Sequence, residues 1–463
     1  MCLNKDHASC GASMMMYYLF FEITANTRHR IKGRLILILI RFFGGIGFIR
    51  EKIIGNRINS FFRFYIKGGF TMKIINLDHI SGNPIHPEVQ EEMIRAIRAD
   101  YGNPSSQHTL GEKALAVLEN ARSRVAKLVN AKDPQEIVFT SGGTESVNHA
   151  VKGVAFAQMK KGRHIVTSNI EHNSVLRSLY RLKGMDFNVT SVPVDEQGRV
   201  NPEDVEKAIR DDTILVSIMH SNNETGTIQP IREIAEITRR KKVIFHTDAV
   251  DSVGVVPIDV QKLGVDLLSF SSNTYYGPTG VGGLYVRKGT RIFPILDGGT
   301  QENRKRAGAE NLVGISGMAK AAELVLKEMA ERTAHVSKLR NKLLTDLPKY
   351  LDDYYFNGSI ENGLPNLVSI SIRYVEGESI MLMLDDEDIL VSTRSACAAG
   401  NLQASHVMLS IGRDHADAQG TLVLTFGSDN TEKDIDRFLA VLRDTVISLR
   451  EISPLYQKIK SAA

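Results

Sequence analysis

The chain has 463 residues, of which 43% are apolar, and this is enough to bury a large core in two or three domains. Its net charge of +4 is unevenly distributed: residues 1–71 hold eleven Lys/Arg and three Asp/Glu, so this segment carries +8 and the rest −4. The main part of the chain therefore lacks the basic character of a nucleic-acid-binding protein. Three cysteines exclude a disulfide framework, which predicts a reducing, cytoplasmic setting.

Residues 1–71 form an apolar, basic segment that we set apart from the fold. A membrane span needs about 20 apolar residues, and Arg41 interrupts the apolar run after six positions. Two interpretations remain: an amphipathic helix on a membrane surface, or translated upstream sequence before a true start at Met72. We favour the second, because residues 67–69 (KGG) can be encoded by a bacterial ribosome-binding sequence. Peptides from residues 1–71 in the native protein would exclude it.

From Met72 onward, short β-rich apolar runs alternate with amphipathic helical patterns such as 144–161 and 202–210. The strands alternate with helices and are almost continuously apolar, which predicts an α/β fold with a mainly parallel sheet covered on both faces. The predicted strands are 136–140, 164–168, 188–194, 213–219, 243–248, 266–271 and 282–286.

A long helical pattern at 318–347 separates this block from a different one. There, 366–373 and 421–427 are predicted strands and 431–452 is a predicted helix. The mixture indicates a smaller α+β domain at the C-terminal end.

Polar or glycine residues follow several of the predicted strands, where ligands of open α/β sheets bind. Gly143 and Thr144 lie between a strand and a helix, where free backbone N–H groups attract phosphate, although many ordinary strand–helix turns also carry glycine. His172 and Asn223 follow later strands, and a lone histidine is more often structural than catalytic. Asp248 ends a strand, and a buried carboxylate there needs a cationic partner such as a protonated pyridine nitrogen.

Ten motifs extend this pattern from Asn76 to about Leu455: LDHISGNP, YGNPSSQH, FTSGGTES, EHNSVL, HSNNETGTIQP, HTDAVDSVG, DLLSFSSNTYYGPTGVGGLYV, GGTQENRKRAGAEN, VEGESI and STRSACAAG. In their order and spacing the chain resembles the cysteine desulfurases (NifS/IscS-like), transferases of the class V aminotransferase group that depend on pyridoxal phosphate. The resemblance implies fold type I, with a seven-stranded sheet in the large domain, and a homodimer. We expect the large cofactor-binding domain at 84–331, and a small domain at 72–83 and 332–463.

The resemblance also implies roles for individual residues. Gly143, Thr144 and Ser271 would hold the cofactor phosphate, and His172 would stack on the pyridine ring. Asp248 would pair with the ring nitrogen, and Asn223 would lie near the ring hydroxyl. Cys397 matches the cysteine that attacks the substrate sulfur and carries the persulfide.

The chain departs from the family in the loop at 271–280. Thr274 stands where the family has the lysine that holds the cofactor covalently, and Asn273 replaces the adjacent histidine. The nearest lysines, Lys262 and Lys288, lie outside the loop. Threonine can neither bond the cofactor aldehyde nor move the substrate proton.

Three further positions differ from the family. Asp251 replaces a glutamine that contacts the ring hydroxyl, and Ala309 replaces a hydroxyl residue that reaches the partner subunit's phosphate. Val423 replaces the arginine that binds the substrate carboxylate. A charge-assisted bidentate pair contributes about 1.5–3 kcal/mol, so this loss alone predicts substrate binding weakened about 10- to 100-fold.

Three functions are consistent with these residues. In the first, the protein lacks ordinary desulfurase turnover and uses Cys397 as a sulfur acceptor or as a ligand of an iron–sulfur cluster, working with an iron–sulfur scaffold or another acceptor protein. Arg394 would then lower the pKa of Cys397, or would simply be a solvated charge. In the second, noncovalent pyridoxal phosphate acts on L-cysteine or a related amino acid, with His172 as the base. In the third, the chain is a non-catalytic dimerising or regulatory subunit. We favour the first.

Overall fold

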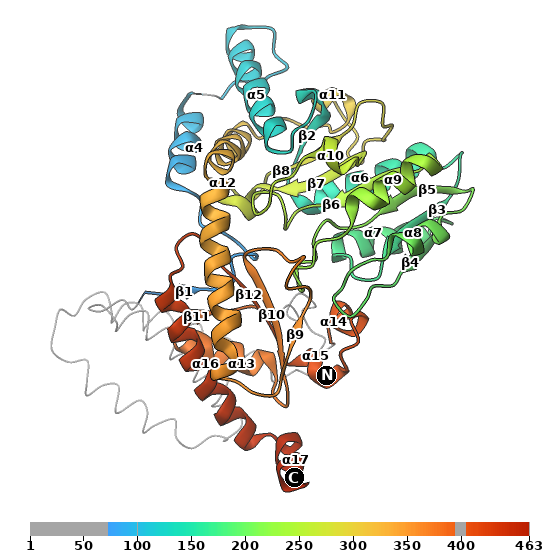
Figure 1. Cartoon of the computed structure of the whole chain (residues 1–463). Helices are drawn as coiled ribbons and strands as arrows, with labels where there is room; N and C mark the ends of the chain where they lie inside the picture. The colour runs from blue at the N-terminus through green and yellow to red at the C-terminus, as the bar shows by residue number, and fades with distance from the viewer. Residues whose placement is uncertain (1–72, 100, 394–403, 463) are drawn as a thin grey trace, which may run out of the picture. The chain divides into compact units, whose positions relative to one another are not determined.

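The main sheet has seven strands in the order β2-β8-β7-β6-β5-β3-β4 in this computed structural model (Figure 1). β8 runs antiparallel to β2 and β7, and the other neighbouring pairs are parallel. The seven predicted strands and the mainly parallel sheet are therefore confirmed. Their bounds are β2 (Ile137–Thr140), β3 (His164–Ser168), β4 (Asn188–Val192), β5 (Thr213–Ser217), β6 (Ile244–Asp248), β7 (Leu267–Ser271) and β8 (Gly282–Val286).

The structure describes residues 73–99, 101–393 and 404–462, and Lys73–Ala463 form one compact unit. The predictions for residues 1–71 lie outside the described residues. Within the described ranges, no helix is both long and apolar enough to cross a membrane.

Successive residues of a strand point to opposite faces of the sheet, so both faces of the main sheet carry apolar side chains. Helices cover both of these faces. In β7, Leu267 packs in a core cluster with α6 (Gly143–Gln158) and α7 (Asn173–Lys183). The next residue, Leu268, belongs to the cluster on the other face, which α5, α9 and α12 help to form. The helices of that face and its surroundings are α4 (Pro87–Ala99), α5 (Thr109–Leu128), α8 (Pro202–Ala208), α9 (Ile231–Lys241), α10 (Val260–Leu263), α11 (Gln301–Arg304) and α12 (Leu312–Asp346).

A second layer of structure is built on the antiparallel sheet β12-β10-β9. The short strand β1 pairs in parallel with β11, so the start of the described chain is joined to its C-terminal part. The remaining elements are β1 (Ile75–Asn76), β9 (Tyr354–Asn357), β10 (Leu367–Ile372), α13 (Gly377–Asp386), β11 (Ile389–Leu390), α14 (His406–Ser410), α15 (His415–Gln419), β12 (Thr421–Thr425), α16 (Glu432–Ile452) and α17 (Pro454–Ala462).

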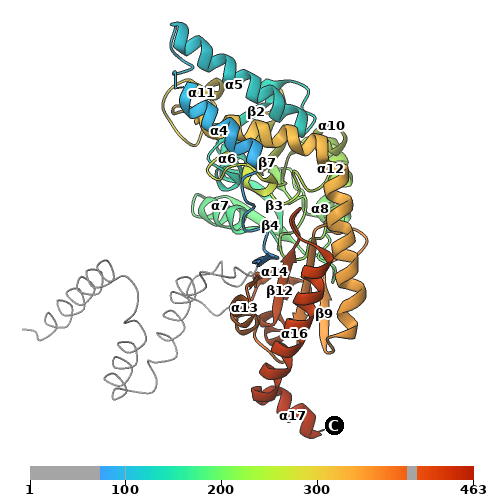
Figure 2. The same ribbon diagram turned by 90° about the vertical axis from the view of Figure 1, so that its left-hand side faces the viewer.

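Helix α12 connects the two layers. Its first half, including Ile315, packs in the core of the main sheet, while Leu339 and Leu343 pack in a second core with β10, β12 and α16. Figure 2 shows that the helix bends between the two halves. Residues near the bend therefore lie where the two layers meet.

Candidate functional site

Four of the predicted site residues lie at one edge of the main sheet. His172 follows β3, Asn223 follows β5, Asp248 ends β6 and Ser271 ends β7. These four strands are parallel, so their carboxyl ends meet at the same edge. The backbone N–H of His220 also donates to the carbonyl of Asp248 over 2.7 Å, which joins the segments that follow β5 and β6.

The turn between β2 and α6 forms a cradle next to this edge. Gly142 has a φ of +148°, and no side chain caps the first turn of α6. A Cβ on Gly143 would lie 2.6 Å from Val250 Cγ2 and 3.6 Å from Ser271 Cβ, so only glycine allows this approach. The N–H groups of the first turn, including that of the exposed Thr144, therefore offer donors to an anion beside Ser271. This arrangement fits a phosphate group.

The Asp248 carboxylate has the properties that a cationic ring nitrogen requires. Its side chain is buried, and burial raises its pKa to about 6. Oδ1 accepts a hydrogen bond from the backbone N–H of Val250 over 3.1 Å. No cationic side chain of the described residues is hydrogen-bonded to Asp248. A buried carboxylate is costly without a positive partner, so the site fits a pyridinium nitrogen.

We expect the affinity for pyridoxal phosphate to depend on the ionisation of Asp248. Below pH 6 the free protein holds a proton on this carboxyl, and a cationic ring nitrogen can bind only after that proton leaves. The affinity therefore falls by up to about tenfold per pH unit below this value. Fluorescence titrations at pH 5 to 8 should show the fall in the wild type, whereas Asp248→Asn should bind more weakly at pH 7 and lack this component. An identical pH profile in both proteins would contradict the assignment.

His172 is exposed and begins α7 as its N-terminal cap. Nδ1 accepts from the backbone N–H of Ser174 over 3.1 Å, and the Ser174 hydroxyl lies 2.8 Å from the same atom. In the neutral ring the hydrogen is therefore on Nε2. This geometry occupies the nitrogen that a base would use.

Glu171, next to His172 in the chain, is fully buried. The sequence did not identify it as a candidate site residue. Oε1 accepts from the Ser168 hydroxyl over 2.7 Å and from the backbone N–H of Met219 over 2.9 Å. Burial raises the pKa of this carboxyl to about 8, so it is protonated at neutral pH. The motif SNIEHNS is polar and carries no signal of this burial.

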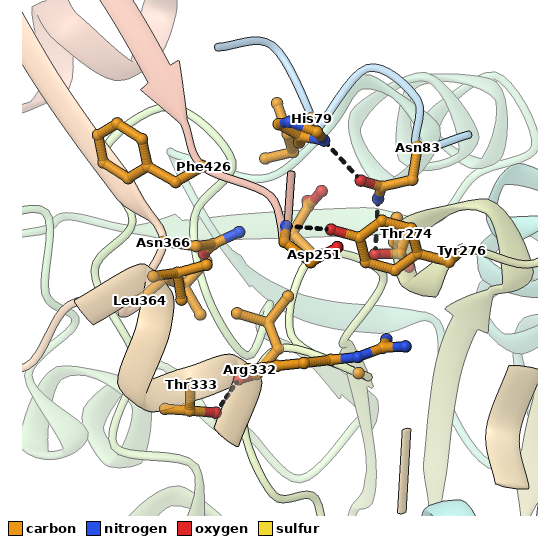
Figure 3. Close-up of a pocket in the computed structure, with 15 residues that line it drawn as sticks. His79, Asn83, Asp251, Thr274, Tyr276, Arg332, Thr333, Leu364, Asn366 and Phe426 are labelled. Atoms are coloured by element: carbon orange, nitrogen blue, oxygen red, sulfur yellow. Dashed lines mark hydrogen bonds between the residues drawn. The ribbon is translucent and has the colours of Figure 1, made fainter. Parts of the chain in front are cut away.

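The turn that carries Thr274 is closed by its own hydrogen bonds. The Thr274 hydroxyl donates to the carbonyl of Ser271 over 2.9 Å, and the Ser271 hydroxyl donates to Asn273 Oδ1 over 2.6 Å. From the other side, Asn83 Nδ2 donates to the carbonyls of Thr274 and Asn273 over 3.0 and 3.3 Å. His79 Nδ1 lies 2.9 Å from Asn83 Oδ1 (Figure 3). The turn is thus held in place without any amine.

Neither neighbouring lysine can reach this turn. Thr274 follows the carboxyl end of β7, whereas the exposed Lys262 precedes β7. Lys288 follows β8, which is antiparallel to β7 and ends opposite Leu267. Both lysines therefore lie at the far edge of the sheet, about 13 Å away along a strand of this length.

Asp251 and Thr274 line a cavity next to this turn (Figure 3). The structure thus brings together two of the residues at which the chain departs from the family pattern. Val423 is fully buried in β12 and packs in an apolar cluster with Ile80 and Val255, both of which also line the cavity. Ala309 is exposed on the loop before α12.

Cys397 and Arg394 lie outside the described residues. Within the described ranges, no group of three or more His, Cys, Asp or Glu side chains could hold a metal ion.

Comparison with known proteins agrees with this architecture. The sequence pattern of the aminotransferase class-V family matches residues 75–438. The chain belongs to this family. Two relatives are the cysteine desulfurases IscS of Dictyoglomus turgidum and Methanosarcina thermophila, which are 47% and 46% identical over 386 residues. These alignments cover 83% of this chain and 98% and 95% of the relatives.

Solved structures of a NifS-like protein and of a cysteine desulfurase share the fold. A NifS-like protein has a TM-score of 0.76 and 38% identity, with 81% of this chain and all of the other covered. An apo cysteine desulfurase from Thermococcus onnurineus has a TM-score of 0.72 and 26% identity, with 81% and 95% covered. The chain therefore has the fold of the pyridoxal-phosphate enzymes of fold type I, as predicted.

Proposed function

We propose that this protein is a sulfur-transfer member of the class-V family that carries sulfur on Cys397 without the lysine-dependent turnover of L-cysteine. Its relatives are named as cysteine desulfurases, which supports sulfur chemistry and iron–sulfur cluster assembly as its setting. The observation that carries the proposal is the Thr274 turn, in which the Thr274 hydroxyl donates to the Ser271 carbonyl and both sequence-neighbouring lysines lie at the opposite edge of the sheet.

In this proposal pyridoxal phosphate binds noncovalently, and when bound it supplies an electron sink. Gly143, Thr144 and Ser271 hold the phosphate, Asp248 holds the ring nitrogen and His172 packs on the ring. Asn223 and Asp251 remain candidates for the side of the ring hydroxyl. The buried, raised-pKa Asp248 and the glycine cradle support retention of the cofactor.

Cys397 would receive sulfur by thiol exchange with a persulfide on a partner protein. The Cys397 thiolate attacks the outer sulfur, a new S–S bond forms, and the partner's thiolate leaves. This exchange needs no external oxidant. A low-pKa thiolate on a loop of small residues suits the reaction, and the same thiolate would suit a cluster ligand.

We expect Cys397→Ser to lose sulfur loading almost completely. Incubation with a persulfidated donor protein, followed by intact-mass spectrometry, should add one sulfur atom to the wild type and none to the variant. In the 463-residue chain, the double variant Cys2→Ser/Cys10→Ser is the matched control and should load normally, because it removes the other two thiols. Equal loading of Cys397→Ser and the wild type would reject the proposal.

The second candidate function, turnover of an amino acid by noncovalent cofactor, is favoured by the retained Asp248 and cradle. Sulfide release from L-cysteine with added pyridoxal phosphate tests it directly. We expect no release above background, since the Nδ1 atom of His172 is already an acceptor. Absence of both sulfur loading and sulfide release would instead indicate the homodimeric, non-catalytic subunit.

A further inference from the structure

A carboxylate lies in the first turn of α6, beside the phosphate cradle. Glu145 is the third residue after the cap Gly142, and its Oε2 accepts from the backbone N–H of Ser141 over 2.7 Å. Burial acts to raise the pKa of Glu145, but hydrogen bonds from Arg306 and Ser141 outweigh it and hold the pKa below its usual value. Glu145 is therefore ionised at neutral pH, and its negative charge lies in the same turn whose N–H groups are offered to an anion.

Arg306 compensates this charge. Its Nε donates to Glu145 Oε1 over 2.9 Å and its Nη2 to Oε2 over 3.4 Å, so the guanidinium covers both carboxylate oxygens. The Arg306 and Glu145 side chains are only 21% and 12% exposed. Salt screens such a sheltered pair less than a surface pair, so the loss of one partner has a larger effect on charges nearby.

The turn that precedes Arg306 has a strained backbone. Glu302, Asn303 and Arg304 have φ angles of +47°, +54° and +63°, and this left-handed region costs residues other than glycine about 1–2 kcal/mol each. A buried ion pair holds the turn in place: Arg122 Nη1 and Nη2 donate to the two carboxylate oxygens of Glu302, both over 2.7 Å.

The same ion pair ties the turn to β2, the strand that leads into the cradle. Glu302 Oε2 accepts from the backbone N–H of Phe139 over 2.9 Å, and Arg122 Nη1 donates to the carbonyl of Ile137 over 2.8 Å. α11, which contains the turn, therefore lies beside β2, and Arg306 follows it closely (Figure 1). Backbone strain persists where surrounding contacts impose it, and it is concentrated at functional sites.

We propose that Arg306 is a positioning residue of the phosphate cradle, which neutralises Glu145 and holds its carboxylate against the Ser141 N–H. An unpaired Glu145 carboxylate would repel a phosphate dianion bound in the same turn and offset the attraction of the helix N-terminus. The inference rests on the proposed noncovalent binding of pyridoxal phosphate, and it gives Arg306 a role that requires no contact with the cofactor. It does not depend on sulfur loading of Cys397.

Calorimetric titration of the full-length protein with pyridoxal phosphate and with pyridoxal tests the proposal, because pyridoxal lacks the phosphate. Arg306→Ala should weaken the binding of pyridoxal phosphate about 3- to 30-fold and change that of pyridoxal less than about twofold. Arg306→Lys keeps the charge without the planar guanidinium and should lie between Arg306→Ala and the wild type.

The double variant Glu145→Gln/Arg306→Ala separates the effect of charge from that of packing. Glutamine keeps an acceptor for the Ser141 N–H and carries no charge. The affinity of the double variant for pyridoxal phosphate should therefore recover to within about threefold of the wild type, whereas a loss caused by packing alone would persist.

Arg240→Ala is the matched control, because the exposed Arg240 pairs with Glu206 over 3.3 Å near the amino end of β6, at the opposite edge of the sheet. Its affinities should equal those of the wild type, and thermal unfolding should confirm that each variant is folded. The inference alone is overturned if folded Arg306→Ala binds pyridoxal phosphate as tightly as the wild type, if pyridoxal loses as much affinity as pyridoxal phosphate, or if the double variant binds no better than Arg306→Ala. If neither probe binds the wild type, the noncovalent cofactor site of the proposed function is rejected as well.

Discussion

Replacing Thr274 by lysine is expected to turn a chain that never retains pyridoxal phosphate after borohydride reduction into one that retains about one cofactor per chain. The wild type has no amine at this position, and Lys262 and Lys288 lie at the opposite edge of the sheet. Thr274 lines the cavity beside the turn, so a longer side chain can extend into it. The substitution loses the hydrogen bond to the Ser271 carbonyl, at a cost of about 1 kcal/mol. Intact-mass spectrometry after reduction measures the result.

Thr274→Met controls for side-chain length without the amine and should retain no cofactor. Sulfide release from L-cysteine should remain low in Thr274→Lys, because Asn273 and Val423 still replace the family's histidine and arginine. Adding Asn273→His supplies a proton-transfer group and should raise the release about 100-fold over the single variant. If borohydride instead fixes cofactor on a lysine of the wild type, the assignment of position 274 is wrong.

The sequence predicted the strands better than the helices of this fold. Six of the seven strands are buried along almost their whole length, and their β-branched and apolar runs differ from the turns around them. Helices α4 and α5 were missed because their buried positions are few or small: α4 buries only Val89 and Ala96, and α5 buries several alanines. Small apolar residues give a weak periodic signal.

The start of α12 shows how tertiary packing overrides local preference. The predicted helix begins at Met318, but the structure starts it at Leu312, with Asn311 capping the N–H of Gly314. Gly314 and Gly317 lower the helix propensity of this turn. A Cβ on Gly317 would lie only 2.8 Å from Met93 and 3.0 Å from Pro278, so close packing requires the glycine.

The candidate site was predictable only where family motifs mark it. His172, Asp248 and Ser271 end or follow parallel strands, whose carboxyl ends meet at one edge of the sheet. Glu171 was missed, since its importance depends on burial and on a neighbour far along the chain, Met219. One sequence cannot show either property.

The wild type is expected to lose stability as the pH rises from 5 to 8. Glu171→Gln should remove much of this loss. The unfolded carboxyl ionises near its ordinary pKa of 4.5, whereas burial raises the folded pKa to about 8. Between these values the folded state binds one more proton than the unfolded state. The free energy of unfolding therefore falls by about 1.4 kcal/mol per pH unit, on the order of 3 kcal/mol by pH 7.

Glutamine is neutral at every pH and keeps the acceptor for the Ser168 hydroxyl and the Met219 N–H. Urea unfolding of both proteins at pH 5, 6, 7 and 8 measures the difference. The free energies of unfolding of the two proteins should be nearly equal at pH 5. Their difference should grow as the pH rises, with the variant more stable at pH 8. Glu203→Gln, an exposed position in the first turn of α8, should follow the wild-type pH dependence.

The neutral state of Glu171 also matters for Asp248, whose charge acts on it through the buried edge of the sheet. A protonated Glu171 leaves Asp248 as the negative charge that faces a cationic ring nitrogen. An ionised Glu171 would add a second buried charge and raise the pKa of Asp248 further. Glu171→Gln should therefore preserve the affinity for pyridoxal phosphate at pH 7, while Asp248→Asn lowers it. If the free energies of unfolding of the wild type and of Glu171→Gln change with pH in the same way from pH 5 to 8, the Glu171 carboxyl is ionised in the folded protein.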